Sequence, residues 1–101
     1  MYRDAEALYK QCLDMTKESL GESHPSTLTT MNSLANTYKS QGKYRDAEVL
    51  FKQCLDKQKA LLGESHPDTL STMNNLALTY GHQGKYREAE VLFKQLSLIH
   101  I

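Results

Sequence analysis

The chain has 101 residues, of which 40% are hydrophobic and 24% charged, with 12 basic and 12 acidic side chains. The formal net charge of zero argues against nucleic-acid binding, because no excess of Lys and Arg is available to neutralise phosphates. No apolar run approaches the roughly 20 residues of a membrane span, and the N-terminal residues do not resemble a signal peptide, so we expect a cytoplasmic protein without membrane insertion.

The sequence repeats itself with a period of 42 residues. The segment 2–6 recurs at 44–48, and recurs again at 86–90 with Glu88 in place of Asp. When 2–43 is aligned with 44–85, 30 of the 42 positions are identical. A fixed period of about 20–50 residues is typical of a solenoid, in which each repeat must stack on its neighbours to bury its apolar side chains.

The first predicted helix, at residues 2–20, is a copy of the third, at 44–62. One face of the third is apolar and holds Tyr44, Ala47, Leu50, Phe51, Cys54, Leu55 and either Leu61 or Leu62. Oppositely charged residues stand four apart in every copy, as Glu6 with Lys10, Glu48 with Lys52 and Glu90 with Lys94. These pairs are interpreted as marking the solvated face of the helix.

The second predicted helix, at residues 25–40, has its apolar residues three or four positions apart, as a helical face requires. Pro25 suits the first helical position, with His24 or Ser23 as the N-cap, and Gly42 can adopt the left-handed conformation that ends a helix. The fourth predicted helix, at 67–82, is its copy, and the fifth spans 86–98. Because the turns between helices are short, consecutive helices must be antiparallel, and the fold is all-α.

The last six residues do not follow the repeat, which requires Cys-Leu-Asp after Gln95. We therefore divide the partial array 1–101 into an unpaired helix at 2–20, a repeat at 25–62, a truncated repeat at 67–95 and an aberrant tail at 96–101. The tail resembles the translation of a sequencing adapter, and our hypothesis is that the chain is a fragment whose tail is an artefact. The Leu and Ile spacing in the tail nevertheless allows the helix to continue.

Within one period, eight residues have the order and spacing of the tetratricopeptide repeat: Leu34, Ala35, Tyr38, Gly42, Tyr44, Ala47, Phe51 and Cys54. The 42-residue unit, with Leu-Gly-x-x-His-Pro in its loop, resembles the repeats of kinesin light chains, of nephrocystin-3-type proteins and of some NB-ARC and NACHT ATPases. The resemblance implies a right-handed superhelical solenoid of about five helices in antiparallel pairs. It implies structural roles for Ala35, Tyr38, Gly42, Tyr44, Ala47, Phe51, Ala77, Tyr80, Gly84, Tyr86 and Ala89.

In the family that the chain resembles, the first helix of each pair lines a concave groove. Carried over by position, a peptide-binding groove would hold Asn32, Asn36, Lys39, Asn74, Asn75, Leu78 and His82. Asn is a mediocre helix former, and its amide both donates and accepts, so these Asn side chains suit an extended peptide. The alternative is that they merely solvate an exposed face. Since Lys39 is the only basic residue nearby, a carboxylate clamp for chaperone tails is not expected.

The remaining reactive side chains are interpreted as structural. Cys12 and Cys54 recur on an apolar face one period apart, so we expect small buried thiols too distant for a disulfide. His24 and His66 precede Pro in loops, where capping is expected rather than metal binding. His82 faces either the groove or water. No catalytic constellation, metal site or cofactor motif is present, and we do not expect an enzyme.

The resemblance therefore implies a protein-protein interaction module that holds protein or peptide ligands in its groove. A kinesin-light-chain-like cargo adaptor is the first interpretation, with kinesin heavy chain or cargo adaptors as partners through regions outside this chain. The second is a sensor or scaffold tail of an NB-ARC- or NACHT-type regulatory ATPase. A structural spacer without a dedicated ligand is the third.

Overall fold

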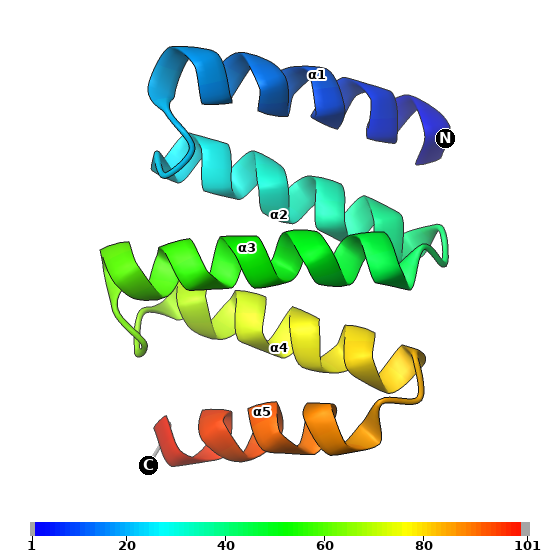
Figure 1. Cartoon of the computed structure of the whole chain (residues 1–101), viewed down its shortest axis with the longest axis vertical. Helices are drawn as coiled ribbons and strands as arrows, with labels where there is room; N and C mark the ends of the chain where they lie inside the picture. The colour runs from blue at the N-terminus through cyan, green and yellow to red at the C-terminus, as the bar shows by residue number, and fades with distance from the viewer. Residues whose placement is uncertain (1, 100–101) are drawn as a thin grey trace.

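The computed structural model describes residues 2–99, with side chains from residue 4 to residue 98, as five helices stacked in one row (Figure 1). They are α1 (Tyr2–Leu20), α2 (Pro25–Ser40), α3 (Tyr44–Leu62), α4 (Pro67–His82) and α5 (Tyr86–Ile99). The predicted bounds are confirmed for the first four, and α5 ends one residue later than predicted. Residues 96–99 of the predicted tail continue α5, whereas 100 and 101 lie outside the described residues.

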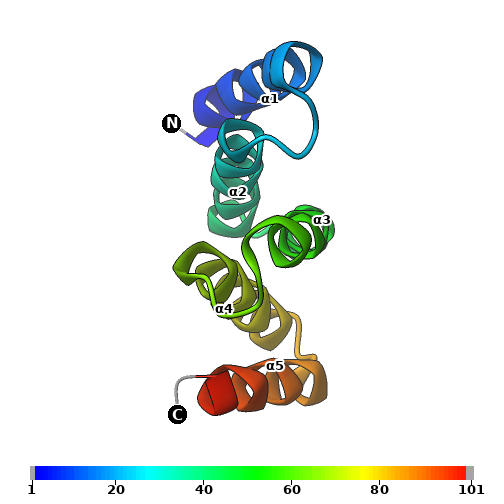
Figure 2. The ribbon, with the colours of Figure 1, turned by 90° about the vertical axis from the view of Figure 1, so that its left-hand side faces the viewer.

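Each helix packs against its neighbours in the chain, and α2 also contacts α4 directly. In the side view of Figure 2, α3 is displaced to one side of α2 and α4, which therefore approach each other on the opposite side. The array measures 37 × 29 × 16 Å. This is the arrangement of a solenoid, in which contacts join only nearby repeats.

The helix ends follow the predicted capping chemistry. Nδ1 of His24 accepts a hydrogen bond from the backbone N–H of Ser26 at 3.1 Å, and Nδ1 of His66 accepts one from Asp68 at the same distance. Both histidines are N-caps and each is followed by Pro at the first helical turn. Gly42 has φ +82°, the left-handed region, so α2 ends where the sequence predicts. The predicted capping role of the two histidines is confirmed.

The core is centred on α3, which packs against both α2 and α4. Phe51 and Ala47 of α3 are fully buried, in one cluster with Met73, Leu76 and Tyr80 of α4. Ala35 and Ala77 are also fully buried, and Ala89 nearly so. Small side chains at these positions let the helix backbones approach closely, so we expect a larger side chain there to overpack the core.

Two residues expected in the core are exposed, which corrects the sequence-based prediction. Cys54 is buried and its thiol donates to the Leu28 carbonyl at 3.6 Å, but Cys12 is exposed. Cys54 packs against the preceding helix α2, and no described helix precedes α1 to do the same for Cys12. Likewise Tyr44 stacks on a residue of α4, whereas Tyr86 is 73% exposed because no described helix follows α5.

Burial also changes the chemistry of the inner thiol. Desolvation raises the pKa of Cys54 to about 11, because a thiolate is poorly solvated between packed helices. A thiol of this kind is protonated and unreactive at neutral pH. The prediction of a buried packing thiol is therefore confirmed for Cys54 and wrong for Cys12.

A glutamate held between two lysines joins each repeat to the next. In this lysine clamp, Lys85 donates to Oε1 of Glu48 at 2.9 Å, and Lys52 lies 3.1 Å from Oε2. Both ammonium groups lie 5.7 Å from the centre of the Tyr80 ring. The earlier copy repeats the arrangement with Glu6 between Lys10 and Lys43, each at 2.9 Å, beside Tyr38.

The clamp corrects the prediction that these glutamates lie on the solvated face. The Glu48 side chain is only 12% exposed, because Lys85, which follows α4, crosses over it from the next repeat. Glu48 does pair with Lys52 of its own helix, but this is only one of its two ion pairs. The second lysine comes from 37 residues along the chain and could not be identified from helical spacing.

The clamp shifts the pKa of its glutamates downward. Hydrogen bonds from Lys10 and Lys43 lower the pKa of Glu6 from 4.5 to about 2. Burial raises the pKa of Glu48, but the hydrogen bonds from Lys85 and Lys52 outweigh it, and the net direction is downward. The charged form of each glutamate is thus favoured by folding.

Among the helices that the structure describes, none is both long and apolar enough to cross a membrane.

Replacing Ala47 by Leu should destabilise the array by about 1–3 kcal/mol, because three added carbons have no space at the fully buried crossing of α3. At about 4–8 °C per kcal/mol for a chain of this size, thermal unfolding monitored by circular dichroism should show a clear fall in Tm. Ala60→Leu is the matched control, because Ala60 is exposed on the same helix. Equal effects of the two substitutions would contradict the close crossing.

Glu48→Gln should lower the free energy of unfolding by about 1–3 kcal/mol at neutral pH, since it removes a carboxylate bonded to two lysines. The folded-state pKa of Glu48 is below the unfolded value of 4.5, so its stabilisation is complete above that pH and is lost as the pH falls. The difference between wild type and variant should therefore shrink below about pH 4.5.

Glu90→Gln is the control for this pH series, because Glu90 pairs with Lys94 alone and is largely exposed. It should change stability by less than about 1 kcal/mol. A difference between wild type and Glu48→Gln that stays constant from pH 7 down to about pH 2 would show that the carboxylate charge is not what matters.

Candidate functional site

A polar hollow lies where α2 and α4 approach each other on the face opposite α3. Its volume is about 280 Å³. The lining residues are Thr29, Asn32, Ser33 and Asn36 from α2, Gln58 from α3, and Asp68, Ser71 and Asn75 from α4. Asp68 is the only charged residue among them. The hollow therefore offers amide and hydroxyl groups to a ligand, with a single negative charge at one side.

Apart from Asn32, the residues that line the hollow stand at positions where the two repeat copies differ. Between 25–40 and 67–82, substitutions occur at positions 26, 29, 33, 36, 39 and 40, which are mostly three or four apart and form one stripe of α2. The buried packing positions of the two helices are identical. The repeats thus keep the residues that pack, and vary every residue that lines the hollow except Asn32.

The two polar atoms of the Asn32 side-chain amide differ in their hydrogen bonding. Its Nδ2 donates to Oγ1 of Thr72 at 2.9 Å, which joins α2 to α4 across the floor of the hollow. Its Oδ1 is buried and accepts no hydrogen bond from any described residue. Thr72 is itself fully buried, so the bond is shielded from water. Asn32 therefore joins α2 to α4 through its nitrogen, while its oxygen lacks a donor within the described part of the chain.

Gln58 is a lining residue that the sequence did not predict, because the resemblance assigns the groove to the first helix of each pair. It comes from α3, is 4% exposed, and its Oε1 has no hydrogen-bond partner among the side chains and backbone groups that the structure describes. A buried acceptor without a donor is costly, and such groups commonly mark a binding site or a water position. The signal was present in the sequence, because the other copy has Thr16 at this position.

A second hollow of about 340 Å³ continues from the first and is mainly apolar. It shares Thr29, Gln58 and Asp68 with the polar hollow, and its other lining residues are Ser23, Pro25, Leu28, Leu61, Leu62 and His66. Leu61 replaces Ser19 of the earlier copy and is exposed. The two hollows together form one site with a polar part and an apolar part.

The predicted groove residues do not all gather in this site. Asn32, Asn36 and Asn75 line the polar hollow. Asn74 instead borders a separate hollow between α4 and α5, whose other lining residues are Pro67, Leu70, Ser71, Phe93 and Leu96. Lys39, Leu78 and His82 lie outside the polar hollow. The ring of His82 is stacked on Tyr44, with centroids 5.0 Å apart and planes 8° from parallel.

Within residues 2–99, no group of three or more His, Cys, Asp or Glu side chains is arranged to hold a metal ion.

Comparison with known proteins places these features in a family. Two profiles of the tetratricopeptide repeat match the chain, one at residues 2–26 and 27–68 and the other at 50–97. None of the curated proteins matches the chain significantly.

Two solved structures are similar in fold and sequence. The nearly identical TPR-like repeats of a predicted kinesin light chain from Podosopora anserina match with a TM-score of 0.91 and 30% identity over 97% of this chain. BtubC (BKLC) from P. vanneervenii matches with a TM-score of 0.90 and 26% identity over the same share. The chain spans 46% of the first structure and 39% of the second.

Asn32→Ala should destabilise the protein by about 1 kcal/mol, because Thr72 would lose its partner in a buried position. Asn36→Ala should be close to neutral in a urea unfolding experiment, since Asn36 is exposed and lines the same hollow without a structural bond. If the two substitutions were equally harmless, the Asn32–Thr72 bond would not contribute to the packing of α2 on α4.

Proposed function

The chain belongs to the tetratricopeptide repeat family, whose members act in protein-protein interaction, and from this premise we propose that the face with the polar hollow binds an extended peptide segment of a partner protein. The peptide would lie across α2 and α4 along the polar hollow. The proposal assigns no catalytic role, since repeats of this family are in general non-enzymatic scaffolds.

The observation that carries the proposal is a pair of buried carbonyl oxygens without donors at the hollow, Oδ1 of Asn32 and Oε1 of Gln58. Backbone N–H groups of an extended peptide are donors of the kind these oxygens lack. Because main-chain groups are common to all sequences, these two contacts would provide affinity rather than specificity.

Specificity would come from the two features that flank these acceptors. The apolar hollow beside Leu28, Leu61 and Leu62 has room for an aliphatic or aromatic side chain. Asp68 borders both hollows and is exposed, so it favours a peptide with a basic residue over one with an acidic residue. The preferred ligand is therefore an extended segment with an apolar residue next to Lys or Arg.

For the longer protein, we propose a kinesin-light-chain-like cargo adaptor in the cytoplasm, supported by the similarity to the Podosopora anserina repeats. Kinesin heavy chain or cargo adaptors would then be the partners. The tail of an NB-ARC- or NACHT-type ATPase is the second candidate, because such tails are built from the same kind of repeat. A spacer without a ligand is less well supported, since the two copies differ along the stripe that faces the hollow.

Panning a phage-displayed library of random peptides against the full chain tests the groove proposal. Enriched peptides should pair an apolar with a basic residue, and their titration should shift the side-chain amide signals of Asn32 and Gln58 in NMR spectra. Gln58→Thr, which restores the residue of the other copy, should weaken binding by about tenfold, the equivalent of one lost buried hydrogen bond.

Gln53→Ala is the matched control, because Gln53 is an exposed amide on the same helix outside both hollows. It should leave the affinity unchanged. Failure of any peptide to be enriched, or equal losses in the two variants, would contradict the groove proposal and support the spacer.

A further inference from the structure

We propose that protonation of His66 regulates peptide binding at the polar hollow, because the charged ring pairs with the Asp68 carboxylate and withdraws it from a basic residue of the peptide. The inference rests on the proposed function for its ligand and adds how that ligand is released. The contact between the two side chains is present without any ligand, so it can be tested separately.

One nitrogen of the His66 ring lies near two groups of the same residue. Its Nδ1 is 3.1 Å from the backbone nitrogen of Asp68, whose N–H it accepts, and 4.0 Å from Oδ2 of the Asp68 carboxylate. In a protonated histidine both ring nitrogens are donors, so Nδ1 can no longer accept the N–H bond. The carboxylate is then its nearest acceptor. Because the Asp68 side chain is 70% exposed, it can rotate to close the remaining distance.

This exchange of partners changes the charge that the site offers to a ligand. Asp68 is the only charged residue that lines the polar hollow, and His66 is the only other titratable residue that lines the adjoining apolar hollow. Imidazole changes its charge between about pH 5 and pH 8, whereas a carboxylate stays ionised there. The pair therefore goes from negative to neutral as the pH falls, and its attraction for Lys or Arg is lost.

The charged groups of the surrounding segments do not replace His66 in this role. Lys57 of α3 lies 3.9 Å from Glu22 of the turn before α2, so these two charges face each other. Glu64, in the same turn as His66, lines a different hollow together with Lys59. The residues that α2 and α3 add to the hollow beside His66 are all uncharged. The charge of this site between pH 5 and pH 8 therefore follows the titration of His66.

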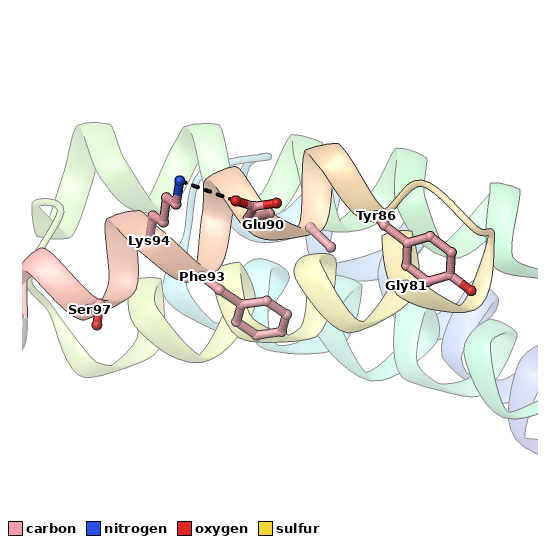
Figure 3. Close-up of a pocket in the computed structure, with 7 residues that line it drawn as sticks. Gly81, Tyr86, Glu90, Phe93, Lys94 and Ser97 are labelled. Carbon is pink, nitrogen blue, oxygen red and sulfur yellow. Dashed lines mark ion pairs between the residues drawn. The ribbon is translucent and has the colours of Figure 1, made fainter.

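Two other hollows with an acidic residue contain a lysine instead of a histidine. Glu90 lines the hollow of about 460 Å³ on the outer face of α5, where Lys94 lies 3.1 Å from it (Figure 3). Glu64 shares its hollow with Lys59. Lysine stays charged throughout this pH range, so these hollows keep their charge. For Asp68, the only ion-pair partner among the described residues is a histidine, which makes the polar hollow the one of the three that responds to pH.

The pair lies beside the group that most clearly lacks a ligand. Gln58 is 4% exposed, and its Oε1 has no donor among the described residues. Gln58 and Asp68 line the same two hollows. A peptide whose backbone donates to Gln58 therefore places a neighbouring side chain beside the Asp68 carboxylate.

The earlier repeat contains the histidine without the carboxylate. Nδ1 of His24 accepts from the N–H of Ser26 at 3.1 Å, the same geometry as in the later copy. Ser26 stands at the position of Asp68. Protonation of His24 therefore removes a helix cap but creates no ion pair with the second helical residue. The two copies separate the loss of a cap from the neutralisation of a carboxylate.

An NMR titration of the full chain from about pH 8 to about pH 5.5 tests the contact without a ligand. The carboxyl carbon signal of Asp68 should change together with the ring signals of His66. In His66→Asn it should stay constant over this range, because Asn caps a helix but gains no proton. An Asp68 signal that ignores the protonation of His66, or that changes as much in the variant, would overturn the proposal.

Fluorescence anisotropy with two labelled peptides tests the effect on binding. One is Gly-Ser-Leu-Arg-Ser-Gly, and the other has Gln in place of Arg. Between about pH 7.5 and about pH 5.5, the Kd of the Arg peptide should rise by about threefold, the size of one exposed ion pair, while that of the Gln peptide should stay nearly constant. His66→Asn should remove the pH dependence. His24→Asn is the matched control and should leave it as in the wild type.

Equal pH dependence for the two peptides, or a pH dependence that survives in His66→Asn, would overturn the regulation by His66 and leave the groove proposal standing. Absence of saturable binding at neutral pH up to about 1 mM of either peptide would contradict the groove proposal, and the regulation with it. The NMR titration distinguishes the two failures, because it reports the pairing of His66 with Asp68 whether or not a peptide binds.

Discussion

No helix in this chain can bury its apolar side chains alone, and every other feature of the structure depends on that constraint. Phe51 is fully buried because α3 lies between α2 and α4, and Ala47 at the same crossing allows the close approach. Packing one helix between two others also brings α2 and α4 together on the opposite side of α3. The hollow between them is thus a consequence of how the core is formed. The Asn32–Thr72 hydrogen bond lies at the floor of the hollow and also contributes to the packing of α2 on α4.

The charges are arranged by the same stacking. A neutral chain with equal numbers of acidic and basic residues could simply have mixed charges over its surface, but here the glutamates of α1 and α3 are each shared between two successive repeats. Because Lys85 follows the end of α4, its bond to Glu48 also sets how far α4 lies along α3. The lysine clamp therefore links successive repeats at a defined point, while the apolar core provides most of the stabilisation.

The sequence predicted the helices well, because capping residues and a 42-residue period are local signals that the structure repeats faithfully. The sequence-based prediction of burial failed where burial depends on neighbouring helices. The 42-residue period predicts the same environment for Cys12 as for Cys54, and for Tyr86 as for Tyr44, although only the inner copies are covered on both sides. The clamp was half recognised for a related reason, because helical spacing finds Lys52 but not Lys85, which lies in the turn after α4. The resemblance to a known family located three of the asparagines in the hollow, but it could not reveal Gln58, which reaches the site from the second helix of the pair.

Hydrogen exchange of individual backbone amides in the native protein tests the stacking account most directly. If stability is the sum of contacts between adjacent helices, the slowest amides of α3 should exchange only by global unfolding. Those of α1 and α5, each covered on one side, should open locally with a smaller free energy. The account predicts protection that falls from α3 toward both ends of the row. Equal protection in all five helices, with one common opening free energy, would show a single cooperative domain and contradict it.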